Sequence, residues 1–148
     1  MVHRPGYKAL RRGRSSIPNQ IYHLTTTTLN RYPFFKDFDT ARRLIKIMQE
    51  QPVNTLAYVV MPDHFHWLIE LRDDSPSISK LMKTTKLKAS LYSQNKKKKI
   101  RWQAGFYDRA IRSHEDIFHV ARYIVANPIR AGICKSIREY PHWDAVWV

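Results

Sequence analysis

Disulfide bonds and membrane-spanning helices are both excluded by what this sequence lacks. It has a single cysteine, Cys134, so no disulfide can link two parts of the chain. No apolar run approaches the roughly 18 residues of a transmembrane helix. The first residues also lack the apolar core of a secretory signal. We therefore expect a cytoplasmic protein that makes no contact with a membrane.

Acidic residues are also scarce. The chain has 12 Asp and Glu against 26 Lys and Arg, which gives a formal net charge of +14. Such a charge favours a polyanionic partner, and nucleic acid is the first candidate. No basic amphipathic helix with a large aromatic face is evident, so a membrane surface is a weaker candidate. With 148 residues and no internal repeat, the chain is expected to form one domain over 1–148, with a basic arm at 1–19 and a tail at 134–148.

The most informative motif is His64-Phe65-His66, at the start of a run in which polar and apolar residues alternate. Phe65, Trp67, Ile69 and Leu71 fall on one face, and both histidines fall on the other. This period of two predicts a half-buried strand. Side chains two apart on a strand are about 7 Å apart, so both imidazoles can reach one divalent ion. A register slip of one residue would bury the histidines, so the apolar face fixes where they point.

The remaining patterns predict alternating strands and helices. Strands are expected at 20–29, 53–61, 64–71 and within 100–111, and helices at about 40–51, 77–96 and 114–126. Pro62-Asp63 predicts a tight turn between two antiparallel strands. His23 lies on the first strand, and a lone strand histidine more often has a structural role than a metal-binding one. The aromatic tail is expected to pack back on the domain.

A second set of polar residues follows helical spacing. His119, Tyr123 and Asn127 are four residues apart and share one face of the helix at 114–126, while the opposite face is apolar. A metal ion on His64, His66 and Asn127 would polarise a phosphodiester oxygen, and Tyr123 would attack the phosphorus. Mixed nitrogen and oxygen ligands suit Mg²⁺ or Mn²⁺, of which Mn²⁺ tolerates imidazole better.

These residues also have ordinary interpretations. A tyrosine on a helix is usually a packing residue, and Asn before Pro usually ends a helix. Spacing alone does not exclude the other phenols, which are Tyr22, Tyr58, Tyr92, Tyr107 and Tyr140.

Several basic residues are candidates for DNA contact because of their charge. They are Arg11, Arg12 and Arg14 in the arm, Lys83 and Lys86 in the predicted basic helix, and Arg112 and Arg130 beside the helix that carries Tyr123. Each is also interpretable as a solvated surface charge, and for Arg112 and Arg130 that ordinary interpretation is slightly favoured.

The motifs together resemble a known family. His-hydrophobic-His on a strand, followed about 60 residues later by Tyr-x-x-x-Asn-Pro on a helix, resembles the single-tyrosine transposases of the HUH endonuclease superfamily. The nearest branch is the REP-associated tyrosine transposases. The matching segments are 22–25, 33–35, 60–66, 102–108 and 121–132.

The resemblance implies an α+β two-layer sandwich with a central antiparallel sheet, of ferredoxin-like or RRM-like type. It implies that Tyr123 cleaves single-stranded DNA and becomes linked to its 5′ phosphate. It also implies that His64 and His66 bind the metal ion with Asn127 as a third ligand. Substrates of this branch are repetitive extragenic palindromes, recognised as DNA hairpins. The wider family often dimerises whereas this branch acts as monomers, so both a monomer and a homodimer stay open.

Two other functions stay open at this point. A non-catalytic DNA- or RNA-binding module of RRM-like fold would explain the charge without the tyrosine. A metallonuclease that uses water would explain the histidines without the tyrosine.

Overall fold

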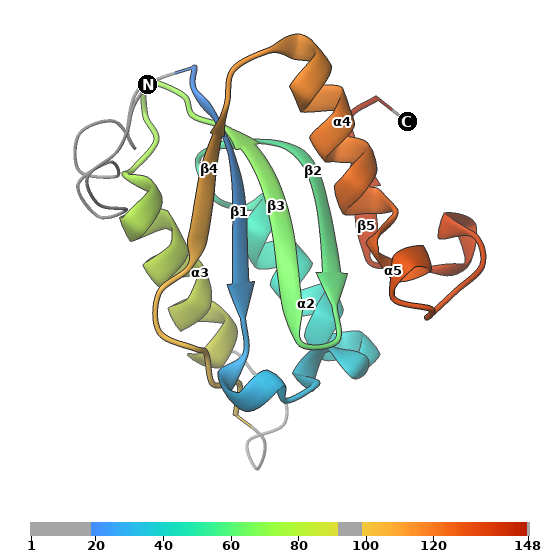
Figure 1. Ribbon diagram of the computed structural model, residues 1–148. Coiled ribbons are helices and arrows are strands. Elements are labelled where there is room, and N and C mark those ends of the chain that lie inside the picture. The colour runs from blue at the N-terminus through green and yellow to red at the C-terminus, as the bar shows by residue number, and fades with distance from the viewer. Residues whose placement is uncertain (1–18, 92–98, 148) are drawn as a thin grey trace.

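Five strands form one antiparallel sheet in the order β4-β1-β3-β2-β5 (Figure 1). The computed structural model describes residues 19–91 and 99–147. The strands are β1 (Ile21–Thr27), β2 (Asn54–Met61), β3 (His64–Glu70), β4 (Tyr107–Ile111) and β5 (Trp143–Ala145). In that part of the chain, no helix is both long and apolar enough to cross a membrane.

The central strand, β3, pairs with β2 on one side and β1 on the other. The β2–β3 hairpin turns at Pro62-Asp63, where Met61 pairs with His64, so the predicted turn is confirmed. On the other side, Thr25 of β1 lies opposite His66. This register places the β1 residues His23 and Thr25 on the same face of the sheet as the two histidines of β3.

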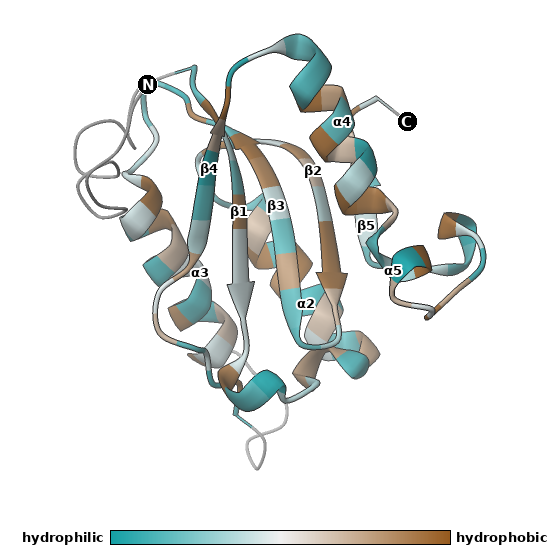
Figure 2. Ribbon diagram, viewed as in Figure 1, coloured by the Kyte–Doolittle hydropathy of each residue, from teal (hydrophilic) through white to brown (hydrophobic). Residues whose placement is uncertain are grey.

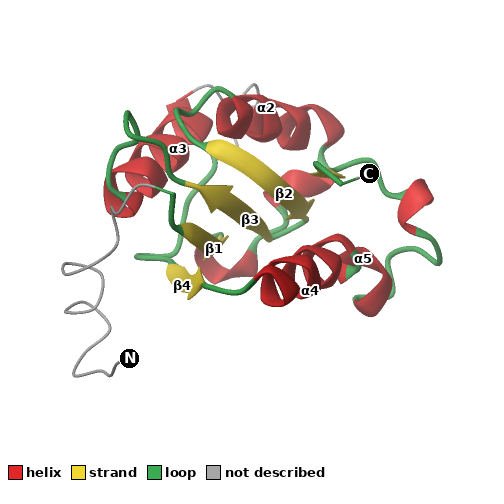
Figure 3. Cartoon of the chain, turned by 90° about the horizontal axis from the view of Figure 1, so that it is seen from above, coloured by secondary structure: helices red, strands yellow, loops and turns green. Residues whose placement is uncertain are grey.

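Helices cover both faces of the sheet (Figure 3). The helices α2 (Phe38–Gln49) and α3 (Ile78–Leu91) lie on one face, and α4 (His114–Val125), followed by the short α5 (Asn127–Arg130), lies on the other. The side chain of Ser113 caps α4 by accepting a hydrogen bond from the backbone N–H of Asp116. Asp37 caps α2 in the same way.

The two faces of β3 belong to two different hydrophobic clusters, whereas the alternating pattern predicted a strand that is buried on one face only. Phe65, Trp67, Ile69 and Leu71 pack with α2 and α3. Leu68 packs with residues of β2 and with the buried side of α4. In Figure 2 the strands carry brown, apolar residues between the helices. The predicted α+β fold with a central antiparallel sheet is confirmed, and α4 adds a partial layer over β2 and β3.

Strand β4 lies within the predicted segment 100–111 but occupies only its second half, because the chain leaves the edge of β1 and then rejoins it. Thr28 forms a bridge with Trp102, and Gln103 N–H donates to the Thr27 carbonyl. Regular pairing resumes only where Tyr107 lies opposite Thr25. The intervening residues 104–106 form an excursion in which Gly105 has a φ of 77°. Glycine adopts this left-handed conformation without the steric cost that a side chain would add.

The tail packs back on the domain, as expected, and adds an unexpected strand. It contains the short 3-10 helix η4 (Ile137–Glu139) and then β5, which pairs with β2 at the edge of the sheet. The buried Tyr140 donates its hydroxyl hydrogen to the Val60 carbonyl. The arm up to residue 18 and the end of the predicted basic helix, at 92–98, lie outside the described residues.

Candidate active site between the sheet and helix α4

His64 and His66 point toward α4 from the end of β3 that follows the hairpin turn. Their ring centroids lie 5.2 Å apart and the ring planes are nearly perpendicular, at 84°. Two imidazoles that share an ion through metal–nitrogen bonds of about 2.1 Å lie at comparable separations. The strand therefore places the pair as the alternating sequence predicts.

The Nδ1 atom of His64 is held by a carboxylate. Asp63 Oδ1 accepts a hydrogen bond from this nitrogen at 2.8 Å, and Asp63 Oδ2 accepts one from Arg31 Nε at 2.8 Å. Burial raises the pKa of Asp63, but the hydrogen bonds from His64 and Arg31 outweigh burial and hold this pKa below its usual value. An ionised carboxylate only accepts, so the proton of a neutral His64 lies on Nδ1 and Nε2 keeps the lone pair.

The Nδ1 atom of His66 is engaged as well. It lies 3.0 Å from Thr25 Oγ1 and 2.9 Å from His23 Nε2. Burial first, and then the positive charges of nearby groups including Arg130, lower the pKa of His66 to about 3. Burial and Arg109 lower the pKa of His23 to about 4. Both rings are therefore neutral at neutral pH, the state that binds metal.

Tyr123 faces this pair from α4. The buried face of the helix, which includes Ile117 and Ile124, fixes its rotation on the sheet. The Tyr123 ring lies edge-on to the His66 ring with 6.4 Å between centroids, and 49% of the tyrosine remains exposed. His66 and Tyr123 line one pocket of about 490 Å³, together with His23 and residues of β4.

Arg130 contacts Tyr123 in two ways. Its guanidinium lies 3.7 Å from the centre of the tyrosine ring, and its Nη2 donates to the Tyr123 carbonyl at 2.6 Å. A carbonyl in the last turn of a helix lacks an intrahelical donor, so Arg130 satisfies that group at the end of α4. The same side chain thus restrains both the backbone and the ring of Tyr123.

Asn127 lies beyond the end of the tyrosine helix. Helix α4 ends at Val125, and Asn127 is the half-buried first residue of α5, with its backbone carbonyl accepting from Ala131. Gly132, with a φ of 75°, follows this short helix, and its N–H donates to the Ile129 carbonyl. Among residues 19–91 and 99–147, no group of three His, Cys, Asp or Glu side chains is arranged to hold a metal ion. The predicted set differs in using an amide, and the role of Asn127 as a ligand stays a prediction.

The other tyrosines that spacing alone did not exclude differ in how exposed their side chains are. Tyr22, Tyr58 and Tyr140 are 3%, 4% and 9% exposed, which buries them away from a strand of DNA. Tyr107 is exposed and lines the same pocket as Tyr123. Tyr92 lies outside the described residues.

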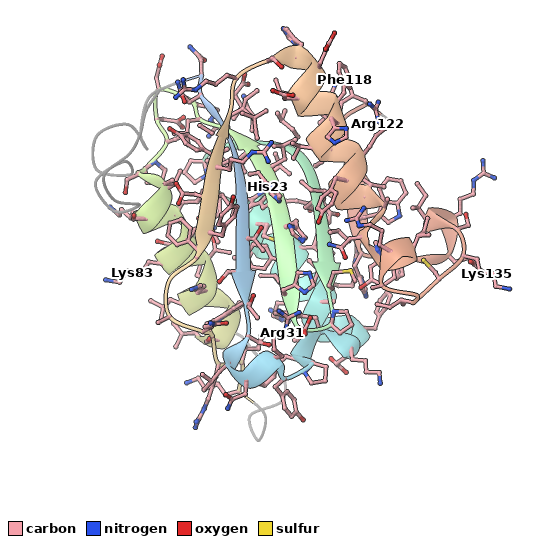
Figure 4. All side chains as sticks on the ribbon, viewed as in Figure 1. His23, Arg31, Lys83, Phe118, Arg122 and Lys135 are labelled. Atoms are coloured by element: carbon pink, nitrogen blue, oxygen red, sulfur yellow. The ribbon has the colours of Figure 1, made fainter. Side chains whose placement is uncertain are left out.

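The predicted DNA-contacting residues have different environments. Arg112 is exposed before α4, and Lys83 points from α3 into solvent (Figure 4). Lys86 is instead partly buried, and its Nζ donates to the backbone carbonyls of Gln103 and Gly105. Burial lowers its pKa. Arg11, Arg12 and Arg14 lie outside the described residues, so no contact is assigned to them.

Sequence reasoning missed the residues that contact His64 and His66. His23 was expected to be structural, yet it contacts His66 directly, and Thr25 and Asp63 were assigned no role. The contacts of His23 and Thr25 depend on the pairing of β1 with β3, which local periodicity does not specify. Only Asp63 left a local signal, since it immediately precedes His64.

Comparisons with known proteins agree with this arrangement. The family model described as "Transposase IS200 like" matches residues 16–127. A REP-associated tyrosine transposase of Escherichia coli is 31% identical over 100 residues, covering 66% of this chain and 58% of that protein. A relative from Haemophilus influenzae is 27% identical over 105 residues, covering 64% of this chain and 60% of that protein. The chain thus spans about 60% of the length of these curated relatives.

A solved structure extends the similarity to three dimensions. A REP-associated tyrosine transposase bound to a REP hairpin superposes with a TM-score of 0.73 at 26% sequence identity. The match covers 88% of this chain and 79% of that one. A transposase structure from Deinococcus radiodurans, at 21% identity and a TM-score of 0.53, shares the fold.

Proposed function

This chain belongs to the IS200-like transposase family, and from that premise we propose that it cleaves and rejoins single-stranded DNA through Tyr123. The proposed metal ligands are His64, His66 and Asn127. The proposed substrate is a DNA hairpin with a single-stranded flank.

One observation carries the proposal, which is the short distance between the rings of Tyr123 and His66. The rings of His66 and Tyr123 lie 6.4 Å apart and line one pocket, although the two residues come from different layers of the fold. A phosphate between them would lie within reach of a phenol on one side and of an ion on the imidazoles on the other. Both groups belong to the same chain, which favours a site complete within one protomer.

The two histidines fit a divalent ion. His66 is neutral at neutral pH, and both histidines use Nδ1 for contacts within the protein, which leaves Nε2 of each as the coordinating atom. A divalent ion bound there supplies Lewis-acid polarisation of the scissile phosphate. Mn²⁺ and Mg²⁺ are the candidates that the nitrogen and amide-oxygen donors suit.

The chemistry assigned to Tyr123 balances without a further reactant. The phenol oxygen forms a bond to phosphorus while the bond from phosphorus to the 3′ oxygen breaks. The phenol loses one proton and the released 3′ hydroxyl gains one. The phosphodiester is conserved as a 5′-phosphotyrosine, so attack by a 3′ hydroxyl reverses the step and rejoins DNA.

Two observations support hairpin DNA as the substrate. The net charge of +14 provides the positive field that phosphate binding needs. The structure that superposes on this fold holds a REP hairpin.

The experiment is a covalent-adduct assay. Labelled hairpin oligonucleotides with single-stranded flanks are incubated with the protein and Mn²⁺, then resolved on a denaturing gel. We expect a protease-sensitive, DNA-linked band that Tyr123→Phe and His66→Ala eliminate, while the control Tyr107→Phe retains it. Binding without an adduct across a panel of hairpins would favour a non-catalytic module. Cleavage that persists in Tyr123→Phe would favour a water-dependent nuclease.

A further inference from the structure

The pocket that holds Tyr123 and His66 is larger than a single phosphate requires. It continues along the inner side of α4 to β4, at the edge of the sheet, and has a volume of about 490 Å³. Small-molecule sites typically fall between about 300 and 1,000 Å³, a range that includes a nucleotide. The base pairs of a duplex stay stacked and cannot enter such a pocket, whereas a base of a single strand can.

The side of this pocket that lies farthest from β2 is formed by two residues of β4. Tyr107 and Arg109 are two residues apart on one strand, so their side chains lie on the same face of the sheet. Their strand partners on β1 are Thr25 and His23, the residues that contact His66. Two β1–β4 residue pairs therefore connect this side of the pocket to the two β1 residues that contact His66.

The chemistry of this wall suits a nucleotide. Tyr107 is 53% exposed and presents an aromatic ring. Arg109 is an exposed cation, and among the described residues no Asp or Glu lines the pocket. Opposite them, His119 and Val120 of α4 close the other side. An aromatic ring next to a guanidinium is the combination that proteins use for a base and its phosphate on a single strand.

We propose that this β4–α4 pocket binds a nucleotide of the single strand adjacent to the phosphate that Tyr123 attacks, with the base stacked on Tyr107 and a phosphate on Arg109. The proposal rests on the proposed function for the identity of the strand. It assigns the flank of the substrate, rather than the hairpin, to this part of the protein.

The test compares two probes by fluorescence anisotropy in EDTA, so that binding is measured without metal-dependent cleavage. One probe is a hairpin oligonucleotide with single-stranded flanks, and the other is the same hairpin without flanks. We expect Tyr107→Ala to weaken binding of the flanked probe about tenfold and to leave the unflanked probe unchanged. Tyr107→Trp should retain affinity. Arg109→Gln should weaken the flanked probe and lower the slope of log affinity against log salt by about 1.

The control is Arg138→Gln on η4, which removes the same charge from an exposed position outside the pocket. It should affect the two probes equally. The proposal would be overturned if Arg109→Gln weakened the binding of both probes equally. It would also be overturned if Tyr107→Ala and Arg109→Gln both bound the flanked probe as tightly as the Arg138→Gln control does. Arg109→Gln keeps the test decisive if Tyr107→Ala does not fold. A wild-type protein that prefers the flanked probe but forms no adduct would contradict the proposed strand transfer alone.

Discussion

The guanidinium of Arg130 lies 3.7 Å from the centre of the Tyr123 ring and also donates to the Tyr123 carbonyl at 2.6 Å. Two contacts from one side chain join the proposed nucleophile to the short helix that follows it. The sequence placed Arg130 among the candidates for DNA contact, and the structure gives it a second role as a restraint on Tyr123.

Removing this restraint should slow chemistry more than it weakens binding. We expect Arg130→Ala to reduce the single-turnover rate of adduct formation about tenfold, because both contacts to Tyr123 are lost. Arg130→Lys should recover part of the rate, since it keeps a cation without the planar fork. Hairpin affinity, measured in parallel, should change little. A loss of affinity as large as the loss of rate would make Arg130 a phosphate contact only.

Asp63 should control metal affinity through His64. In Asp63→Asn the carboxylate that orients His64 is lost, and we expect Mn²⁺ affinity to fall about tenfold or more. Isothermal titration with Mn²⁺ measures this without DNA. Arg31→Gln removes only the outer partner of Asp63 and should have a smaller effect. Unchanged affinity in Asp63→Asn would show that His64 needs no orienting partner.

Two lysines on α3, Lys86 and Lys83, should differ in how much they contribute to the stability of the fold. Lys86 donates to the carbonyls of Gln103 and Gly105, and Lys83 is exposed on the same helix. We expect Lys86→Met to lower the free energy of unfolding by about 1–2 kcal/mol, because the excursion at 104–106 loses a charged donor. Lys83→Met should leave stability unchanged within about 0.5 kcal/mol. Equal unfolding curves for the two variants would refute the structural role of Lys86.

Acid should destabilise the metal-free protein through its buried histidines. Burial lowers the pKa of His23 to about 4 and that of His66 to about 3, whereas histidines of the unfolded chain titrate near 6.5. Between these values the unfolded chain binds more protons, so the free energy of unfolding falls as pH drops below about 6.5. Above that pH the contribution is constant.

Urea unfolding in EDTA between about pH 7 and pH 5, above most carboxylate titration, measures this effect. His23→Gln should have a smaller pH dependence than wild type over that window. His142, which is also buried with a lowered pKa, should retain part of the dependence in the variant. Identical pH profiles for wild type and His23→Gln would contradict the proposed cause.

Local sequence patterns predicted the elements on which the site is built. The alternation from His64 to Leu71 predicted both the strand and the face that the histidines occupy, because the burial of Phe65 and Trp67 leaves one register available. Spacing on α4 likewise predicted that Tyr123 points away from its buried side.

Contacts between distant segments could not be predicted in this way. The roles of His23 and Thr25 follow from the pairing of β1 with β3. Strand β5 has only three residues, and its conformation depends on the free edge of β2 that it pairs with. The late start of β4 depends on the excursion that Lys86 holds from α3. Each of these needs a partner far away in the sequence.

The most direct test of the central claim is the identity of the residue that becomes linked to DNA. The covalent product formed in Mn²⁺ is digested with protease and nuclease and sequenced by mass spectrometry. We predict one modified peptide, with a 5′-linked nucleotide on the Tyr123 hydroxyl. Modification of Tyr107 instead, or cleaved DNA with no modified peptide, would contradict the account.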